Sequence, residues 1–208
     1  MSRFTLQEGK KYTFSDYFEM EHPVEEIVTA LGYTLILQTV QFLQDQKCDT
    51  TRIQRLRDSY YELLPKITIT SEIAKREFMI APLLYEVIRQ VDARLHVDYQ
   101  LDVDEYLSGS VDYFIRAAQE LVIVEAKHGD LDRGFNQLAV ELIAVDRYED
   151  PQPLHKVYGA ITIGEVWKFA VLERDKKRII KDLHTLRYPE VIEEIFSVLC
   201  GILTHNQG

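Results

Sequence analysis

The sequence predicts an α/β protein in which a mixed central sheet is flanked by helices and preceded by a helical N-terminal portion. Three observations predict this class. Apolar residues recur at helical spacing over most of residues 23–94. The period changes to two from His96 onward, as in a strand with one buried face. A continuous apolar run, Leu121–Val124, then follows, and such runs are typical of central strands covered on both faces.

The size and composition are those of one globular domain. The chain has 208 residues, of which 46% are hydrophobic and 28% charged, so it can form a substantial core. We expect a single domain over 1–208, with a helical N-terminal extension at 1–70 and the main core at 71–203.

The net charge limits the kinds of partner. A formal charge of −10 gives no global attraction to nucleic acid, which is bound through Lys and Arg that neutralise phosphates. A nucleic-acid partner would therefore need a local basic patch or a metal ion.

The cysteines and the apolar stretches point to the cytoplasm. Cys48 and Cys200 are far apart and form no CxxC pair, which fits a reducing compartment. The first 14 residues lack the apolar region of a signal peptide, and no stretch is apolar enough to span a bilayer. We expect a cytoplasmic protein with no membrane contact.

Two helices are predicted in the N-terminal portion. The first covers 23–45, where Pro23 and Glu25 suit the first turn of a helix. The second covers 50–64 and stops at Pro65.

A third helix is predicted over 71–94. Ser71 suits its N-cap, and Pro82 inside it should kink or divide it. Strands should follow in the segments "HVDYQLDVDEYL", "SVDYFIRA" and Leu121–Lys127. A helix at 131–148, two strands in "KVYGAITI" and "VWKFAVLER", and a closing helix at 189–203 complete the expected order.

Glu125 and Lys127 at the end of the apolar strand are the first candidate site residues. An acidic residue followed two positions later by Lys occurs four times in the chain, but only here does the pattern end an apolar strand. The period of two places both residues on one face, about 7 Å apart at the backbone. The preceding strand contains a lone acidic residue, Asp112, in an apolar run.

Two interpretations of these residues remain open from spacing alone. Carboxylates on adjacent strands suit Mg²⁺, which takes oxygen ligands, and a nearby lysine can orient water or stabilise developing charge. The alternative is a salt-bridged strand end in which Asp112 caps a turn.

The order of elements and the motifs "GSVDYFI" and "LVIVEAK" resemble the PD-(D/E)xK nuclease superfamily over roughly residues 71–175. The resemblance implies a restriction-endonuclease-like fold and a nuclease that depends on Mg²⁺ or Mn²⁺ and acts on nucleic acid, with DNA as the first expectation. It also leaves room for a homodimer.

The same resemblance implies a role for individual residues. The metal ligands would be Asp112, Glu125, the carbonyl of Ala126, and Glu77, with Glu72 and Glu86 as alternatives to Glu77. Lys127 would match the catalytic lysine, and Gln137 the polar residue often found on the next helix.

The chain departs from the family pattern at two positions. Val111 stands where the proline of the family motif is expected. Glu141 stands four residues after Gln137, where the RecB-like subgroup has tyrosine. An acidic group there would bind metal or repel phosphate.

The densest basic cluster is a second candidate contact for nucleic acid. Its members are Arg174, Lys176, Lys177, Arg178 and Lys181. They could bind phosphates beside the metal, with a charged, solubilising turn as the alternative. We expect the aromatic residues Tyr113, Phe114 and Trp167 to belong to the core and not to a base-stacking surface.

Three classes of function follow. The first is a metal-dependent phosphodiesterase acting on nucleic acid. The second is a catalytically silent nuclease fold that serves as a protein or nucleic-acid binding partner. The third, a small-molecule enzyme, lacks support, because the chain has no Gly-rich phosphate loop, no GxSxG motif and no Cys–His pairing.

Overall fold

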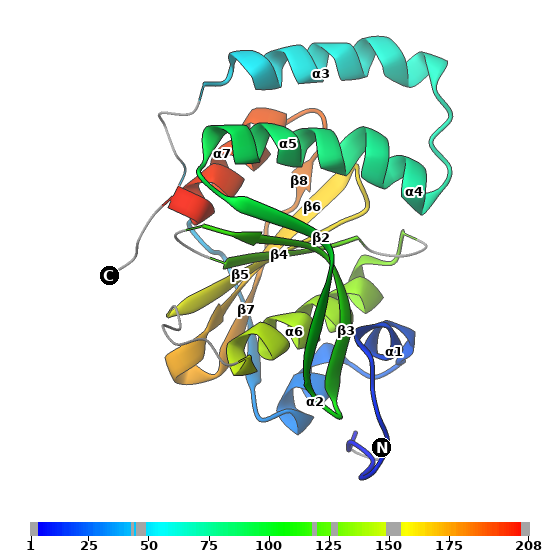
Figure 1. The fold of residues 1–208 in the computed structure, drawn as a ribbon, viewed down its shortest axis with the longest axis vertical. Helices are drawn as coiled ribbons and strands as arrows, with labels where there is room; N and C mark the ends of the chain where they lie inside the picture. Colours follow the sequence, from blue (N-terminus) through cyan, green and yellow to red (C-terminus); the bar gives the residue numbers. More distant parts are fainter. Residues whose placement is uncertain are drawn as a thin grey trace.

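The computed structural model describes residues 4–42, 44, 49–117, 120–125, 129–148 and 155–204, and for 120–125 it describes the backbone alone. These residues form an α/β protein with a mixed sheet between two layers of helices (Figure 1). No helix among the described residues is both long and apolar enough to cross a membrane.

The N-terminal portion contains α1 (Phe14–Glu19), α2 (Val24–Ala30) and the strand β1 (Thr34–Gln38). The prediction of one helix over 23–45 is therefore wrong, because the chain turns into the sheet after α2. β1 runs parallel to β7 (Arg178–Asp182), from Thr34 opposite Arg178 onward.

Gly32 is the residue that ends α2. It has φ 85°, a left-handed conformation that glycine adopts without steric cost. The Gly32 N–H donates to the Thr29 carbonyl at 3.0 Å, and the Tyr33 N–H donates to the Val28 carbonyl at 2.9 Å. These two bonds form a Schellman motif, which satisfies the last carbonyls of the helix.

The next helices agree with the predicted boundaries more closely. α3 (Thr51–Leu63) continues into the short 3₁₀ turn η1 (Leu64–Lys66). The helix predicted over 71–94 is divided, as expected, into α4 (Glu72–Lys75), the π-helical turn η2 (Arg76–Ile80) and α5 (Ala81–Gln90). The Ser71 hydroxyl caps α4 by accepting a hydrogen bond from the Ala74 N–H at 3.1 Å.

The predicted strand–strand–strand–helix–strand segment is present. Its elements are β2 (Arg94–Asp104), β3 (Leu107–Arg116), β4 (Glu120–Glu125), α6 (Leu131–Arg147) and β5 (Lys156–Thr162). β2, β3 and β4 pair antiparallel, whereas β4 and β5 pair parallel, with α6 as the crossover between them.

The C-terminal part completes the sheet. It contains β6 (Val166–Glu173), the turn η4 (Arg174–Lys176), β7, the short β8 (Leu186–Arg187) and α7 (Ile192–Thr204). The described strands lie in the order β1-β7-β6-β5-β4-β3-β2, with β8 beside β6. β7 was not among the strands predicted from the sequence.

Each face of the sheet has its own core. One core joins the sheet to α1, α2 and α6 through residues such as Phe14, Ile27 and Leu138. The other joins it to α3, α5 and α7 through residues such as Ile53 and Leu84. Figure 1 shows α3, α5 and α7 on one side of the sheet and α1, α2 and α6 on the other.

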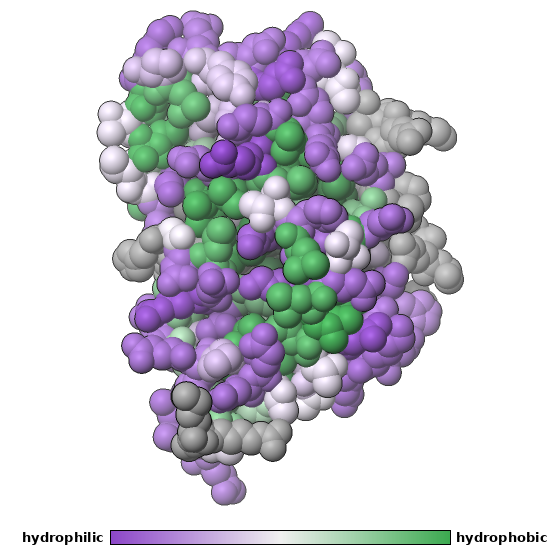
Figure 2. Space-filling model, turned by 180° about the vertical axis from the view of Figure 1, so that it is seen from behind, coloured by the Kyte–Doolittle hydropathy of each residue, from purple (hydrophilic) through white to green (hydrophobic). Residues whose placement is uncertain are grey.

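Most of the residues predicted for the core are in it. Trp167, Tyr113 and Phe114 are at most 4% exposed, which confirms their assignment to the core. On the face opposite that of Figure 1, hydrophobic patches are separated by polar residues (Figure 2).

A buried ion pair ties the end of α6 to the turn between β6 and β7. The Arg174 guanidinium lies 3.1 Å from the Asp146 carboxylate, and the two side chains are only 9% and 12% exposed. The Tyr33 hydroxyl donates to the other Asp146 oxygen at 2.5 Å. One carboxylate thus connects α6, the α2–β1 loop and η4.

Replacement of Asp146 by alanine should destabilise the protein strongly, since it removes the carboxylate that balances the charge of a buried guanidinium. We expect Asp146→Ala to lower the free energy of unfolding by about 3 kcal/mol, as measured by urea denaturation. The control Asp175→Ala removes an exposed ion pair with His155 and should change it by less than about 1 kcal/mol. Equal effects of the two substitutions would contradict the connecting role of Asp146.

The buried tyrosines should make the fold sensitive to alkali. Burial raises the pKa of Tyr33 to about 12, with a further contribution from its hydrogen bond to Asp146. Burial also raises the pKa values of Tyr17, Tyr60 and Tyr188 above the usual 10.0. Between pH 10 and 12 the tyrosines of the unfolded chain release protons that those of the folded chain keep. The free energy of unfolding must therefore fall as pH rises through this range.

Urea denaturation at a series of pH values between 9 and 12 measures this decrease, and absorbance of tyrosinate follows the titration. Tyr33→Phe should reduce the slope, because it removes one of the groups that titrates. A free energy of unfolding that is constant across this range would contradict the assignment.

Candidate functional site

The β2–β3 hairpin rotates at Asp98 and Asp112, so that side chains two positions apart point to opposite faces of the sheet. In the antiparallel register Val97 pairs with Tyr113 and Tyr99 pairs with Val111, so Asp98 and Asp112 oppose each other between two regular pairs. Asp98 has φ 51°, an uncommon left-handed conformation for a residue other than glycine.

The packing on either side of Asp112 shows that the strand rotates about its axis. Val111 belongs to the core beneath α6, whereas Tyr113 belongs to the core beneath α5. Residues two apart in a regular strand share a face, so the strand must rotate at Asp112. In Figure 1 the far half of the hairpin bends away from the sheet toward α1.

Asp112 is also where β3 separates from β4. The pairing of these strands runs from Arg116–Glu120 to Tyr113–Ile123 and stops one residue short of Asp112. β4 continues beside β5 as far as the pair Glu125–Thr162. Asp112, which is half-buried, therefore lies at a fork close to the end of β4.

This register bears on the expectation that Asp112 and Glu125 converge on one face. If β3 and β4 continued to pair, Asp112 would lie opposite Val124. Its side chain would then point to the opposite face from that of Glu125. The rotation of β3 at Asp112 removes that constraint. The Glu125 side chain, and all of Ala126, Lys127 and His128, lie outside the residues that the structure describes.

Arg76, at the start of the π-helical turn, reaches this fork from the neighbouring helix. Its Nη2 lies 3.0 Å from Asp98 Oδ1, and its Cζ lies 5.2 Å from the centroid of the Tyr113 ring. Burial would lower the pKa of Arg76, but side-chain hydrogen bonds with Tyr113 and Asp98 and the charge of Asp112 raise it. The guanidinium thus keeps its charge beside Asp98 and under the influence of the Asp112 charge. Neither Arg76 nor Asp98 was among the site residues predicted from the sequence.

The glutamates that were predicted on this helix have different surroundings. Glu77 is exposed within the π-helical turn, and Glu72 is exposed at the start of α4. Glu86 lies farther along, 4.0 Å from Arg52 of α3, and lines a separate pocket with Asp49 and Arg89. Of the three, only Glu77 is next to Arg76 in the sequence, and its side chain is exposed to solvent.

Gln137 and Glu141 form a buried polar pair on α6. They are 3% and 0% exposed, and the Gln137 Nε2 donates to Glu141 Oε1 at 2.8 Å. Among the described residues, Gln137 Oε1 has no hydrogen-bond partner. Buried polar atoms without partners are uncommon and call for an explanation, so Gln137 stays a candidate on α6.

The described residues contain no group of three or more His, Cys, Asp or Glu side chains arranged to hold a metal ion. The predicted ligand Glu125 falls outside that description, because only its backbone is described.

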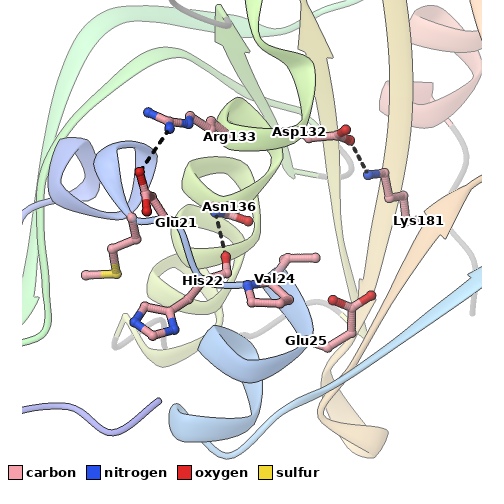
Figure 3. Close-up of a pocket in the computed structure, with 10 residues that line it drawn as sticks. Glu21, His22, Val24, Glu25, Asp132, Arg133, Asn136 and Lys181 are labelled. Atoms are coloured by element: carbon pink, nitrogen blue, oxygen red, sulfur yellow. Dashed lines mark hydrogen bonds and ion pairs between the residues drawn. The ribbon is translucent and has the colours of Figure 1, made fainter. Parts of the chain in front are cut away.

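A separate pocket of about 560 Å³ lies on the α6 side of the sheet. Since β1, β4, β5 and β7 run in the same direction, their carboxyl ends meet at one edge, as at the ligand sites of many α/β proteins. The pocket is lined by the α1–α2 loop, the first turns of α6 and Lys181 of β7 (Figure 3).

Opposite charges balance one another around this pocket. Lys181 pairs with Asp132 at 3.3 Å, and Arg133 lies 3.9 Å from Glu21. The Asn136 amide donates to the His22 carbonyl at 3.3 Å, which fixes the loop against α6. These residues come from three distant segments, so no local motif could have identified the pocket.

The predicted basic cluster is largely neutralised by acidic partners. Arg178 Nε lies 2.8 Å from a Glu173 oxygen, and Lys176 lies 3.1 Å from the other. Despite burial, these two cations lower the pKa of Glu173. With Arg174 on Asp146 and Lys181 on Asp132, four of the five basic groups have a carboxylate partner.

Comparison with models of known protein families, with curated proteins and with solved structures gives no match to this chain. The physical arrangement of the fork therefore carries the functional argument.

The left-handed conformation of Asp98 should limit which residues this position tolerates. Asp98→Asn removes the charge but keeps a side chain that tolerates φ 51°, so stability should change little. Asp98→Val should lower the free energy of unfolding by about 1 to 2 kcal/mol more than Asp98→Asn, as measured by thermal and urea denaturation.

Asp102→Val on the same strand is the matched control. Asp102 is also exposed, but its φ is not positive. If Asp98→Val and Asp102→Val have the same effect, the bend does not depend on the conformation of Asp98.

Proposed function

We propose that this protein is a metal-dependent nuclease with a restriction-endonuclease-like fold that hydrolyses phosphodiester bonds of nucleic acid, in the first place DNA. The observation that carries the proposal is the position of Asp112, at the fork where β3 leaves β4 and close to the residue that ends β4. The order α5, three antiparallel strands, α6 and a parallel β5 supports it, because this is the order that the sequence resemblance implied.

The residues that would hold Mg²⁺ or Mn²⁺ are Asp112, Glu125, the carbonyl of Ala126, and Glu77. This donor set fits the ion chemically, since all four groups offer oxygen, which hard divalent cations prefer. The half-buried setting of Asp112 supports a site that is only partly accessible to water. The bound cation would supply Lewis-acid polarisation of the phosphate and of the attacking water.

Lys127 would orient that water and stabilise the negative charge that develops on the phosphoryl oxygens. The water would lose a proton to solvent as its oxygen forms a bond to phosphorus and the bond from phosphorus to the leaving sugar oxygen breaks. The leaving oxygen then takes up a proton from solvent. Gln137, fixed by Glu141, would act as a polar group beside the reacting phosphate.

Nucleic-acid binding would depend mainly on the metal and on a few local cations, because the chain is acidic overall. Lys176, Lys177 and Arg178 are weaker candidates for phosphate contacts than the sequence suggested, since Glu173 already neutralises two of them.

A second candidate is a catalytically silent nuclease fold that binds another protein. Exposed apolar side chains along α4, η2 and α5 favour it: Ile73 is 67% exposed, Tyr85 52% and Phe78 46%. Such side chains can contribute to an interface, which includes the case of a homodimer.

The nuclease proposal predicts metal-dependent cleavage that requires Lys127. The purified protein should cut DNA with Mg²⁺ or Mn²⁺ and stop when EDTA is added. Lys127→Ala should reduce the rate by at least about a hundredfold, because electrostatic stabilisation of the transition state is lost. Its thermal midpoint should stay close to that of the wild type, as measured by circular dichroism.

Lys168→Ala, a lysine substitution in β6, is the matched control and should cut at the normal rate. Full activity of Lys127→Ala would support a structural ion pair instead of a catalytic role. Failure of the wild type to bind metal or to cut DNA or RNA would favour the silent fold.

A further inference from the structure

Arg76 lies where three irregularities of the backbone meet. It begins the π-helical turn, a rare element that is frequent at functional sites. It contacts Asp98, which is in the left-handed conformation, and it lies close enough to Asp112 for that charge to act on it. Regular structure is thus interrupted in the helix, in β2 and in β3 at one place.

The contacts of Arg76 suit a residue that is held in position but can change partners. Its Nη2 lies 3.0 Å from Asp98 Oδ1, and its guanidinium carbon lies 5.2 Å from the Tyr113 ring centroid. Its side chain is 26% exposed, whereas that of Asp98 is 64% exposed. One side of the guanidinium is therefore packed and the other is accessible to solvent.

The charges at the fork explain why a cation is needed there. Asp98 and Asp112 oppose each other across the β2–β3 ladder, and like charges in such positions repel. Arg76 provides the positive charge that offsets this repulsion. A guanidinium can also bind two oxygens of a phosphate at once, which an ammonium group cannot do in the same fixed geometry.

We propose that Arg76 is the resident counter-ion of Asp112 and that it turns to the substrate phosphate when a divalent cation binds Asp112. This proposal rests on the proposed nuclease function. A divalent cation on Asp112 repels the guanidinium, and an incoming phosphate attracts it. Arg76 therefore opposes metal binding in the free protein and favours substrate binding in the metal-loaded protein.

These two effects have opposite signs, which distinguishes the proposal from a merely structural role. Arg76→Met removes the charge and keeps an apolar stem of similar length. We expect the dissociation constant for Mn²⁺, measured by calorimetry or electron paramagnetic resonance, to fall about fivefold or more, because a competing cation has been removed. With saturating Mn²⁺, kcat/KM for DNA cleavage should fall by at least about tenfold.

Arg76→Lys should lie between the wild type and Arg76→Met in both measurements, since it keeps the charge and loses the bidentate geometry. Arg52→Met, which removes an arginine paired with Glu86 on the same side of the sheet, is the matched control and should change neither quantity. Asp98→Asn should release Arg76 from one partner and lower kcat/KM less than Arg76→Met does.

The outcomes separate this inference from the nuclease proposal. Unchanged Mn²⁺ affinity in Arg76→Met, or weaker metal binding together with weaker cleavage, would overturn the counter-ion role while leaving the nuclease proposal intact. Tighter Mn²⁺ binding in a protein that cuts no nucleic acid would support the counter-ion role and contradict the nuclease function. A wild-type protein that binds no Mn²⁺ would overturn both.

Discussion

The rotation of the β2–β3 hairpin at Asp98 and Asp112 is the constraint on which the candidate site depends. It lets one continuous pair of strands contribute Tyr113 to the core under α5 and Val111 to the core under α6. A regular strand could not place Val111 and Tyr113 in different cores, because residues two apart would share a face. The rotation also ends the pairing of β3 with β4 before Asp112, so a carboxylate is left at the fork and not buried within a ladder.

The two opposing aspartates at the rotation need a compensating cation, and the π-helical turn supplies Arg76. Pro82 follows in the first turn of α5 and cannot donate a backbone hydrogen bond, which helps to explain why the helix is irregular there. The helix, the hairpin and the charge balance are therefore linked. On the other side of the sheet, α6 contains a buried glutamine and glutamate that are hydrogen-bonded to each other.

The sequence predicted the elements whose pattern is local. The alternation in β2 and β3, the apolar run of β4 and the amphipathic α6 follow from neighbouring residues alone. β1 was mistaken for helix because its strand state depends on parallel pairing with β7, far along the chain, although Gly32 was a local sign that α2 ends there. The ion pair of Arg76 with Asp98 could not be predicted, because it requires a left-handed aspartate that no spacing rule indicates. The pocket in Figure 3 could not be predicted either, because Glu21, Asp132 and Lys181 come together only in the folded chain.

The most direct test of the central claim is the location of a divalent cation in crystals of the protein soaked with Mn²⁺, found by anomalous diffraction. We expect a single strong peak at the fork, about 2.1 Å from a carboxylate oxygen of Asp112 and beside Glu125, with the Arg76 guanidinium moved away from Asp112. A peak only among the acidic residues of the pocket in Figure 3, or no peak at all at saturating Mn²⁺, would contradict it.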